Sequence, residues 1–229
     1  MRADITIHEG SPYPLGLTVV NETRINLAAV LFGREECGVI LYPRKGGSII
    51  RFPFSSRNRV GNIYCMALEG IRAEDYAYNF YKGDQVITDP YAKGIRGNER
   101  WGSSVDPTLK GCYRRPYFDW GEDCAPLTPL CDSFLYLIHV RGFTKHPSSG
   151  VCARGTFAGI IEKLPYLLEL GVTAVELMPA YEFIEMEREK PNNRSMAEAV
   201  AHLADAVSEE VCRINYWGYK KGYYFAPKA

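Results

Sequence analysis

The sequence has no excess of charge of either sign. Its 27 lysine and arginine residues balance its 27 aspartate and glutamate residues, so the formal net charge is zero. A strongly basic protein attracts nucleic acids or anionic membrane surfaces through long-range electrostatics, and this chain lacks that attraction. We therefore expect neither a nucleic acid nor a membrane as its partner.

Long apolar segments are also absent from the sequence. A helix that spans a bilayer needs about 20 consecutive, predominantly apolar residues, and no such run occurs. The N-terminus, MRADITIHEG, has no apolar core of the kind that signal peptides carry. The sequence thus gives no sign of membrane insertion or secretion.

The cysteines and histidines show no spacing that is typical of a metal site. The seven cysteines are odd in number and include no C-x-x-C pair, so a disulfide framework is not indicated either. His139, His146 and His202 have no metal-like spacing, and no glycine-rich phosphate-binding loop with its lysine is present. We expect reduced thiols in a cytoplasmic protein, with no metal and no cofactor.

Short β-type runs occupy residues 15 to about 100. Glycine, proline, asparagine and charged residues separate these runs, as in PRKGG and SSRNRVGN. Strands of this length and spacing predict an all-β sandwich, and no helical periodicity competes with it. The expected strands are Leu17–Val20, Ile25–Phe32, Gly38–Leu41, Ser48–Phe54, Ile63–Leu68 and Tyr76–Tyr81.

The pattern changes after residue 132. Ser133–Val140 and Val172–Pro179 are continuous apolar runs, which are typical of strands buried on both faces. Thr156–Gly171 has helical spacing, and we expect Pro165 to divide it into two short helices. Together these segments predict one β-α-β unit with parallel strands. Because two strands cannot bury both faces of a sheet, we expect the chain to be a piece of a larger domain.

The chain divides into three parts on these patterns. Residues 1–105 form the predicted β-sandwich, and residues 133–229 contain the β-α-β unit. Residues 106–132 hold four prolines, which argue against a long helix or a central strand and favour a connection between domains. Ser195–Val211 is predicted to be an amphipathic helix, with Ser195 and Glu198 as its capping box.

The sequence offers few candidates for catalytic residues. Glu176 and Glu182 lie near the end of the second predicted parallel strand, where α/β proteins gather their sites, and could act as acid and base. Alternatively, Glu176 makes a buried hydrogen bond and Glu182 lies on a loop. His139 could be a base or a core histidine held by hydrogen bonds. Ser148 and Ser149 lack the G-x-S-x-G context of a hydrolase nucleophile.

Aromatic residues crowd the end of the sequence, in NYWGYKKGYYFAPKA (Asn215–Ala229). A ring cluster of this kind either completes a core or forms a flat platform for a ligand. The C–H face of a sugar is apolar, so a sugar is one ligand that such a platform suits. Composition alone leaves both interpretations open.

Five stretches carry a resemblance to a known group of enzymes. LYLIHVRGFTKHPSSGV, GTFAGIIEKLPYLLELGVTAVELMPAYEF and NYWGYKKGYYFAPK resemble the start of the catalytic barrel of α-glucan debranching enzymes. DPYAK (Asp89–Lys93) and FDWGED (Phe118–Asp123) match the same group, in the same order. The chain thus resembles the N-terminal portion of the isoamylases, pullulanases and glycogen-debranching enzymes of the α-amylase superfamily. Its β-rich part is similar to a family 48 carbohydrate-binding module.

The resemblance implies a multidomain fold and a substrate class. The fold is an immunoglobulin-like β-sandwich followed by the first part of a (β/α)₈ TIM barrel. The substrates are branched α-glucans, namely glycogen, amylopectin and pullulan. The catalytic carboxylates of this group lie on later barrel strands, so we expect no catalytic residue in this chain and no hydrolysis by it alone. The alternative is a non-catalytic α-glucan-binding protein or an inactive fragment.

The resemblance also implies one substrate-binding loop. Tyr219 matches the residue that stacks under the sugar at the cleavage subsite, and Trp217 and Asn215 match supporting positions of the same loop. Glu176 matches a scaffold position rather than a catalytic one. Leu137 stands where the group usually has a glutamate, so a hydrogen-bonding group of the first barrel strand is missing here.

Overall fold

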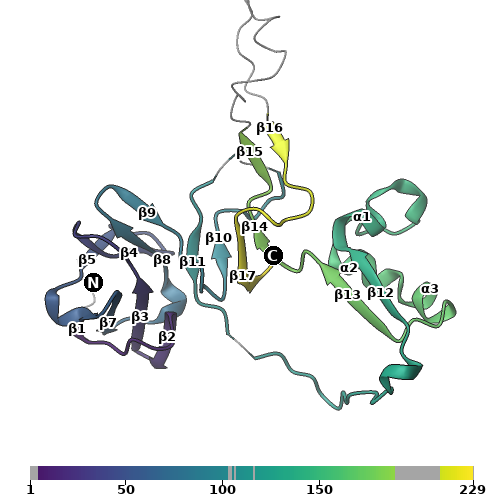
Figure 1. Ribbon diagram of the computed structural model, residues 1–229, viewed down its shortest axis with the longest axis horizontal. Coiled ribbons are helices and arrows are strands. Elements are labelled where there is room, and N and C mark those ends of the chain that lie inside the picture. Colours follow the sequence, from purple (N-terminus) through teal and green to yellow (C-terminus); the bar gives the residue numbers. More distant parts are fainter. Residues whose placement is uncertain (1–4, 103–104, 106, 116, 189–211, 229) are drawn as a thin grey trace, which may run out of the picture.

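A computed structural model describes residues 5–102, 105, 107–115, 117–188 and 212–228. In this part of the chain the protein is mostly β-sheet with few helices (Figure 1). The helix predicted at Ser195–Val211 lies outside the described residues.

Two antiparallel sheets build the N-terminal half. Their strands are β1 (Thr6–Glu9), β2 (Gly16–Asn21), β3 (Arg24–Val30), β4 (Cys37–Pro43), β5 (Ile50–Pro53), β6 (Arg59–Val60), β7 (Ile63–Glu69), β8 (Tyr76–Lys82), β9 (Gln85–Ile87), β10 (Ile95–Arg96) and β11 (Lys110–Cys112). The first sheet has the order β1-β7-β3-β2, with β6 paired to β7. The second has the order β10-β11-β8-β4-β5, with β9 paired to β8. Single-turn 3₁₀ helices η1 (Ser56–Asn58) and η2 (Ala73–Asp75) lie between strands.

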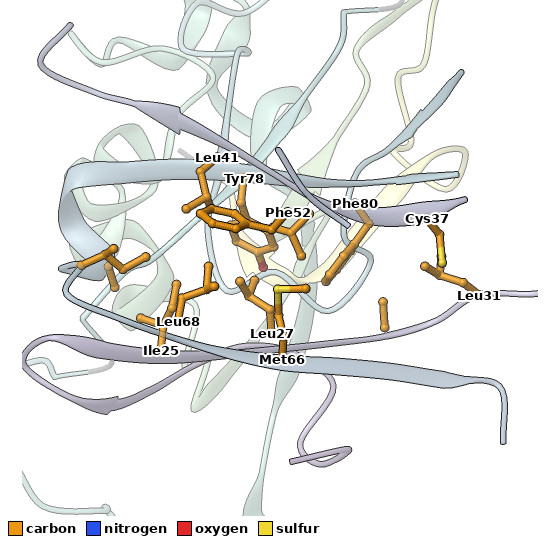
Figure 2. Close-up of a cluster of buried hydrophobic side chains, with 14 residues drawn as sticks. Ile25, Leu27, Leu31, Cys37, Leu41, Phe52, Met66, Leu68, Tyr78 and Phe80 are labelled. Atoms are coloured by element: carbon orange, nitrogen blue, oxygen red, sulfur yellow. The ribbon is translucent and has the colours of Figure 1, made fainter. Parts of the chain in front are cut away.

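The two sheets face each other across one apolar core (Figure 2). Ile25, Leu27 and Met66 come from the first sheet, and Leu41 and Phe80 come from the second. Alternate residues of a strand point to the same face, so the apolar alternation of β3 places Ile25 and Leu27 side by side in the core. Each fully buried side chain of this kind contributes about 1.5–3 kcal/mol, which makes this cluster the main stabilising element of the N-terminal half.

All six predicted strands of this half occur, with small shifts at their ends. Five shorter strands were missed, because two to four residues are too few to show a period of two. One of them, β11, lies in the segment 106–132 that was expected to be a connection. Its residues pair with β8 on one side and β10 on the other, so this segment is partly built into the second sheet.

The predicted β-α-β unit follows residue 132. Its elements are η3 (Leu130–Asp132), β12 (Leu135–His139), α1 (Val140–Lys145), η4 (Pro147–Ser149), α2 (Phe157–Glu162), α3 (Leu164–Glu169) and β13 (Ala174–Met178). Strands β12 and β13 are parallel, with Leu137 opposite Glu176. Pro165 lies in the first turn of α3, where it divides the predicted helix in two as expected.

Only one face of the β12–β13 pair is covered. Ile138 and Leu177 pack with Ile160 and Leu167 of the helices. On the opposite face Leu137 is 52% exposed. The described residues place no further strand beside this pair, so one face of these apolar strands stays uncovered, as expected for two strands alone. Two parallel strands are present, and a closed barrel is not part of the described fold.

Two small antiparallel pairs complete the described fold. Strands β14 (Tyr181–Phe183) and β17 (Gly222–Pro227) form one pair, and β15 (Met186–Arg188) and β16 (Cys212–Ile214) form the other. Ala226 of β17 packs in a small core with Ile95 of β10 and with Leu109. The C-terminal strand therefore contacts residues that extend the second sheet of the N-terminal half.

Asp89, in the DPYAK stretch, is a buried carboxyl group of the N-terminal half, with 1% of its surface exposed. The Tyr78 hydroxyl donates to its Oδ2 at 2.5 Å, and the Tyr91 N–H donates to its Oδ1 at 2.9 Å. Burial raises the pKa of Asp89 above its ordinary value, and these two hydrogen bonds oppose that rise. The folded protein therefore holds a proton on this carboxyl more tightly than the unfolded chain does.

We expect Asp89 to make the folded protein less stable as the pH rises. Its stabilising contribution is complete below the unfolded pKa of about 3.9 and is lost as the pH rises through the raised folded pKa. Urea unfolding at about pH 4 and about pH 7 tests this, because wild type should lose more stability between the two values than Asp89→Asn, which cannot ionise. Equal losses of stability in the wild type and in Asp89→Asn would show that ionisation of Asp89 does not cause the pH dependence.

Candidate functional site

The aromatic loop, residues 215–220, lies against the carboxyl end of β12. His139, the last residue of β12, stacks flat on Tyr216, with ring centroids 4.2 Å apart and planes inclined by 4°. The same imidazole meets Trp217 edge-on, with centroids 5.2 Å apart. Proteins with parallel strands gather their binding residues at this end of the strands, so the loop lies where a site is expected.

Hydrogen bonds engage both ring nitrogens of His139. Nδ1 accepts from the Gly142 N–H at 2.9 Å, and Nε2 lies 2.9 Å from the Tyr216 carbonyl oxygen. A carbonyl oxygen only accepts, so Nε2 carries the proton. Nδ1 accepts and therefore carries none, which makes this the neutral, Nε2-protonated tautomer. His139 is therefore held by hydrogen bonds and has no lone pair left for base catalysis. It is partly exposed rather than buried in a core.

Asn215 organises the backbone of the aromatic loop. Its Nδ2 donates to the carbonyl oxygens of Ile184 at 3.0 Å and Lys220 at 2.8 Å. Its own N–H donates to the Glu185 carbonyl oxygen at 2.8 Å. Both protons of the amide nitrogen are thus used to hold the two ends of the loop together. This geometry suits the supporting role that the resemblance implies for Asn215.

Trp217 and Tyr219 remain open to solvent within this fixed loop. Their exposed fractions are 51% and 63%. The Tyr219 hydroxyl donates to the Met178 sulfur at 3.6 Å, and Met178 is the last residue of β13. A ring that is held at its hydroxyl end and exposed on its face offers a flat apolar surface for stacking. The loop therefore brings all three residues of the expected site together. Asn215 holds the backbone of the loop by hydrogen bonds, and Trp217 and Tyr219 present exposed rings.

Gly218 allows the loop to approach the end of β13. Its φ is +71°, and a Cβ at this position would lie 2.8 Å from Cγ of Pro179 and 3.0 Å from Cδ1 of Phe183. A larger residue at this position would be strained for two reasons, the positive φ of its backbone and the close approach of its Cβ to Pro179 and Phe183. Neither Gly218 nor the stacked pair of His139 and Tyr216 was identified from the sequence, because both depend on contacts between distant segments.

We expect Gly218→Ala to displace the aromatic loop and to lower stability by about 2 kcal/mol. Gly150→Ala is the matched control, because Gly150 has a similar φ of +69° and a Cβ there would meet no atom within 4 Å. Gly150→Ala should lower the free energy of unfolding by only about 1 kcal/mol, the cost of placing alanine at a positive φ. Trp217 fluorescence and urea unfolding measure the two effects, and equal losses would argue against the contact with Pro179.

The remaining rings of the aromatic tail divide between core and surface. Tyr223 packs against the small core of the C-terminal strand. Tyr224 meets Tyr181 edge-on at 4.6 Å, and Phe225 stacks on Tyr91 with centroids 5.4 Å apart. The core interpretation therefore holds for Tyr223, and the interpretation of the exposed rings as a platform for a ligand stays a prediction.

The two glutamates considered as acid and base lie in different surroundings. Glu176 is exposed on β13, and Glu182 is 1% exposed on β14. The Glu182 carboxylate lies 2.5 Å from Lys228 Nζ and accepts from Asn98 Nδ2 at 3.0 Å. A buried carboxylate held in this way is part of a structural ion pair. The alternative placements were also wrong, since Glu176 is not buried and Glu182 lies on a strand.

No metal site or membrane span is present in the described part of the chain. No three of its His, Cys, Asp or Glu side chains are grouped to hold an ion, and none of its helices has the length and apolar character to cross a membrane. Cys37, Cys65 and Cys112 are buried, and burial raises the pKa of each thiol. These three thiols are thus kept protonated and unreactive.

Plant and bacterial proteins share much of this sequence. The chain is 33% identical to isoamylase 3, chloroplastic, of Oryza sativa subsp. japonica, over 95% of this chain and 29% of the relative. It is 32% identical to the glycogen operon protein GlgX homolog of Mycobacterium bovis, over 62% of this chain and 20% of that protein. The homologues of this chain are isoamylases and GlgX proteins. No protein-family model matches the chain.

Solved structures agree with this relationship at the level of the fold. Pullulanase type I from Bacillus subtilis str. 168, complexed with maltose, superposes on this isoamylase homologue with a TM-score of 0.65. The identity is 23%, over 94% of this chain and 28% of the pullulanase chain, so it shows a shared fold only. The resemblance to isoamylases and pullulanases is thereby confirmed. This chain spans less than a third of the length of the isoamylase and of the pullulanase that it matches.

Proposed function

We propose that this isoamylase homologue is the N-terminal portion of an α-glucan debranching glycoside hydrolase. Such an enzyme hydrolyses O-glycosyl bonds in glycogen, amylopectin or pullulan. The observation that carries the proposal is the 33% identity to an isoamylase over 95% of the chain. The catalytic carboxylates would lie on later strands of the complete enzyme, as retaining glycosidases need two carboxyl groups across the cleaved bond.

The same proposal assigns a role to each part of the chain. Residues 1–105 are the immunoglobulin-like, carbohydrate-binding-module-like sandwich. Residues 106–132 are the connection, of which β11 also completes the second sheet of the sandwich. Residues 133–229 are the first part of a TIM barrel. The uncovered face of the β12–β13 pair supports this assignment, because Leu135 and Leu137 are 57% and 52% exposed there and the inner faces of barrel strands pack together in a closed barrel.

The aromatic loop is the proposed substrate contact. Tyr219 stacks under a glucose ring, Trp217 borders it, and Asn215 holds the loop in shape. The exposed ring faces of Tyr219 and Trp217 support this, since they lie at the carboxyl ends of the parallel strands where barrel enzymes bind substrate. The maltose in the Bacillus subtilis pullulanase structure is an α-glucan fragment of the chemistry that such a platform suits.

We also propose a cytoplasmic location, on the basis of the reduced thiols. The rice and maize relatives are named chloroplastic, so a plastid is the competing compartment. Antibody staining of the source cells separates the two. Signal confined to plastids would overturn the cytoplasmic assignment.

The proposal is tested by measuring binding and hydrolysis together. The purified 229-residue chain is mixed with amylopectin, glycogen and pullulan, and co-sedimentation and release of reducing ends are measured. We expect no hydrolysis by the chain alone, and hydrolysis by the longer protein of which we propose it to be part. Reducing ends released by the chain alone would contradict the placement of the carboxylates. A longer protein that binds without hydrolysis would favour the alternative, a non-catalytic α-glucan-binding protein.

A further inference from the structure

A pocket rich in arginine lies at one end of the second sheet, and nothing in the proposed function uses it. Its volume is about 310 Å³. We call it the basic pocket and define it by Arg44, Arg96, Glu99, Cys112, Tyr113 and Arg114. Such a volume is at the lower end of the range for small-molecule sites, about 300–1,000 Å³.

The register of the sheet explains why two of these arginines meet. Tyr42 of β4 and Cys112 of β11 both pair with Ala77, on opposite sides of β8. Both outer strands run antiparallel to β8, so they run in the same direction. Arg44 follows Tyr42 by two positions, and Arg114 follows Cys112 by two positions. Both arginines therefore leave the sheet at the same end.

The third arginine of the pocket, Arg96, lies on β10. This strand is antiparallel to β11, and the Cys112 N–H donates to the Gly94 carbonyl oxygen at 2.8 Å just before β10 begins. A Cβ on Gly94 would lie 2.5 Å from Cγ of Arg114, so the glycine leaves room for the stem of this arginine. Arg96 follows on β10 and lines the same pocket.

One carboxylate lies among these arginines. Glu99 Oε1 accepts from the Gly97 N–H at 3.1 Å and lies 3.4 Å from Arg96 Nε. Hydrogen bonds from the backbone, first from Gly97, and the nearby Arg96 guanidinium lower the pKa of Glu99. The carboxylate thus stays ionised and offsets the charge of Arg96.

The other two arginines keep their charge available. Arg44 donates through Nη1 to the Glu74 carbonyl oxygen at 2.9 Å, which orients the guanidinium without neutralising it. The Glu74 carboxylate itself faces Arg115 at 3.7 Å. Neither Arg44 nor Arg114 makes an ion pair with any residue that the structure describes. Three guanidinium groups less one carboxylate leave the basic pocket with a surplus of two positive charges.

We propose that the basic pocket binds a phosphate group, carried by a phosphomonoester or as inorganic phosphate. Such a group carries about 1.5–2 negative charges at neutral pH, which matches the surplus. Arginine forms paired, charge-assisted hydrogen bonds with phosphate oxygens, and these are stronger than neutral ones. The pocket is larger than a phosphate ion, so a sugar phosphate is the better fit. This inference does not depend on the proposed glucan chemistry.

The test is a calorimetric titration of the intact chain with inorganic phosphate and with glucose 6-phosphate. Arg44→Gln and Arg114→Gln should each weaken binding by about 10-fold or more, because each removes a charged donor pair. Glu99→Gln should tighten binding several-fold, because it removes the carboxylate that repels the ligand and keeps an acceptor for the Gly97 N–H. Arg57→Gln is the matched control, an exposed arginine outside the pocket, and should leave affinity unchanged.

The two ligands distinguish the sources of the phosphate group. Tighter binding of glucose 6-phosphate would identify a phosphomonoester site, and equal binding would identify inorganic phosphate as sufficient. Arg114→Lys keeps the charge but loses the planar fork, so its affinity should lie between wild type and Arg114→Gln even if the latter folds poorly. No binding of either ligand at millimolar concentration, or an equal loss in Arg57→Gln, would overturn the proposal.

Discussion

Replacing Lys228 by methionine is expected to lower the free energy of unfolding by about 3–5 kcal/mol. The Lys228 ammonium contacts the carboxylates of Glu182 and Glu185, which are 1% and 2% exposed. The lysine side chain itself is only 13% exposed. Without it, Glu185 keeps the Gly102 N–H as a partner but loses the ammonium, in a place that water does not reach.

The expected loss is large because this ion pair joins distant segments. The Lys228 N–H donates to the Ala180 carbonyl oxygen at 2.9 Å, at the start of β14. Asn98 Nδ2 donates to Glu182 Oε1 at 3.0 Å and to the Phe183 carbonyl oxygen at 3.2 Å, so a segment after β10 is tied in as well. Loss of the ammonium therefore weakens the β14–β17 pair that carries the aromatic loop.

Two further variants identify the cause of the loss. Lys220→Met removes a lysine whose side chain is 78% exposed and 3.9 Å from Glu187, so it should cost well under about 1 kcal/mol. Adding Glu185→Gln to Lys228→Met removes one of the buried charges and should recover part of the stability. Urea unfolding followed by tryptophan fluorescence measures all three. Equal losses in Lys228→Met and Lys220→Met would contradict a role for burial.

The sequence predicted those parts of the fold that depend on local pattern. The short β-type run in Ile25–Phe32 and the helical spacing around Pro165 are properties of neighbouring residues, and both were confirmed. Strands β10 and β11 were not predicted, because each is very short and is stabilised by partners far along the chain. The exposed face at Leu137 shows the same limit, since an apolar run indicates a strand but does not supply its neighbours.

The candidate site divides in the same way. Tyr219, Trp217 and Asn215 were found through a motif in one short loop, and their role in substrate binding stays a prediction. The partner of that loop, His139, was singled out only as a histidine in an apolar strand. Its stacking on Tyr216 joins residues 77 positions apart, and no local spacing signals such a contact.

Tyr219→Ala is expected to lower kcat about 100-fold in a debranching enzyme that contains this chain, a prediction that rests on the proposed function. Glycosidases distort the sugar ring toward an oxocarbenium-like transition state, and this distortion contributes several kcal/mol. A ring stacked under that sugar supports the distorted shape, and a loss of about 2.7 kcal/mol corresponds to 100-fold. The KM for long glucans should change less, because their other units keep their contacts.

Two tyrosine variants serve as controls for this effect. Tyr219→Phe keeps the ring face and loses only the hydrogen bond to the Met178 sulfur, so its kcat should stay close to wild type. Tyr224→Ala removes a ring that is equally exposed, at 62%, but lies on β17 outside the aromatic loop. Steady-state hydrolysis of pullulan measures all three. An unchanged kcat in Tyr219→Ala, or an equal loss in Tyr224→Ala, would remove Tyr219 from the substrate site, because stacking requires this ring at this position and no other.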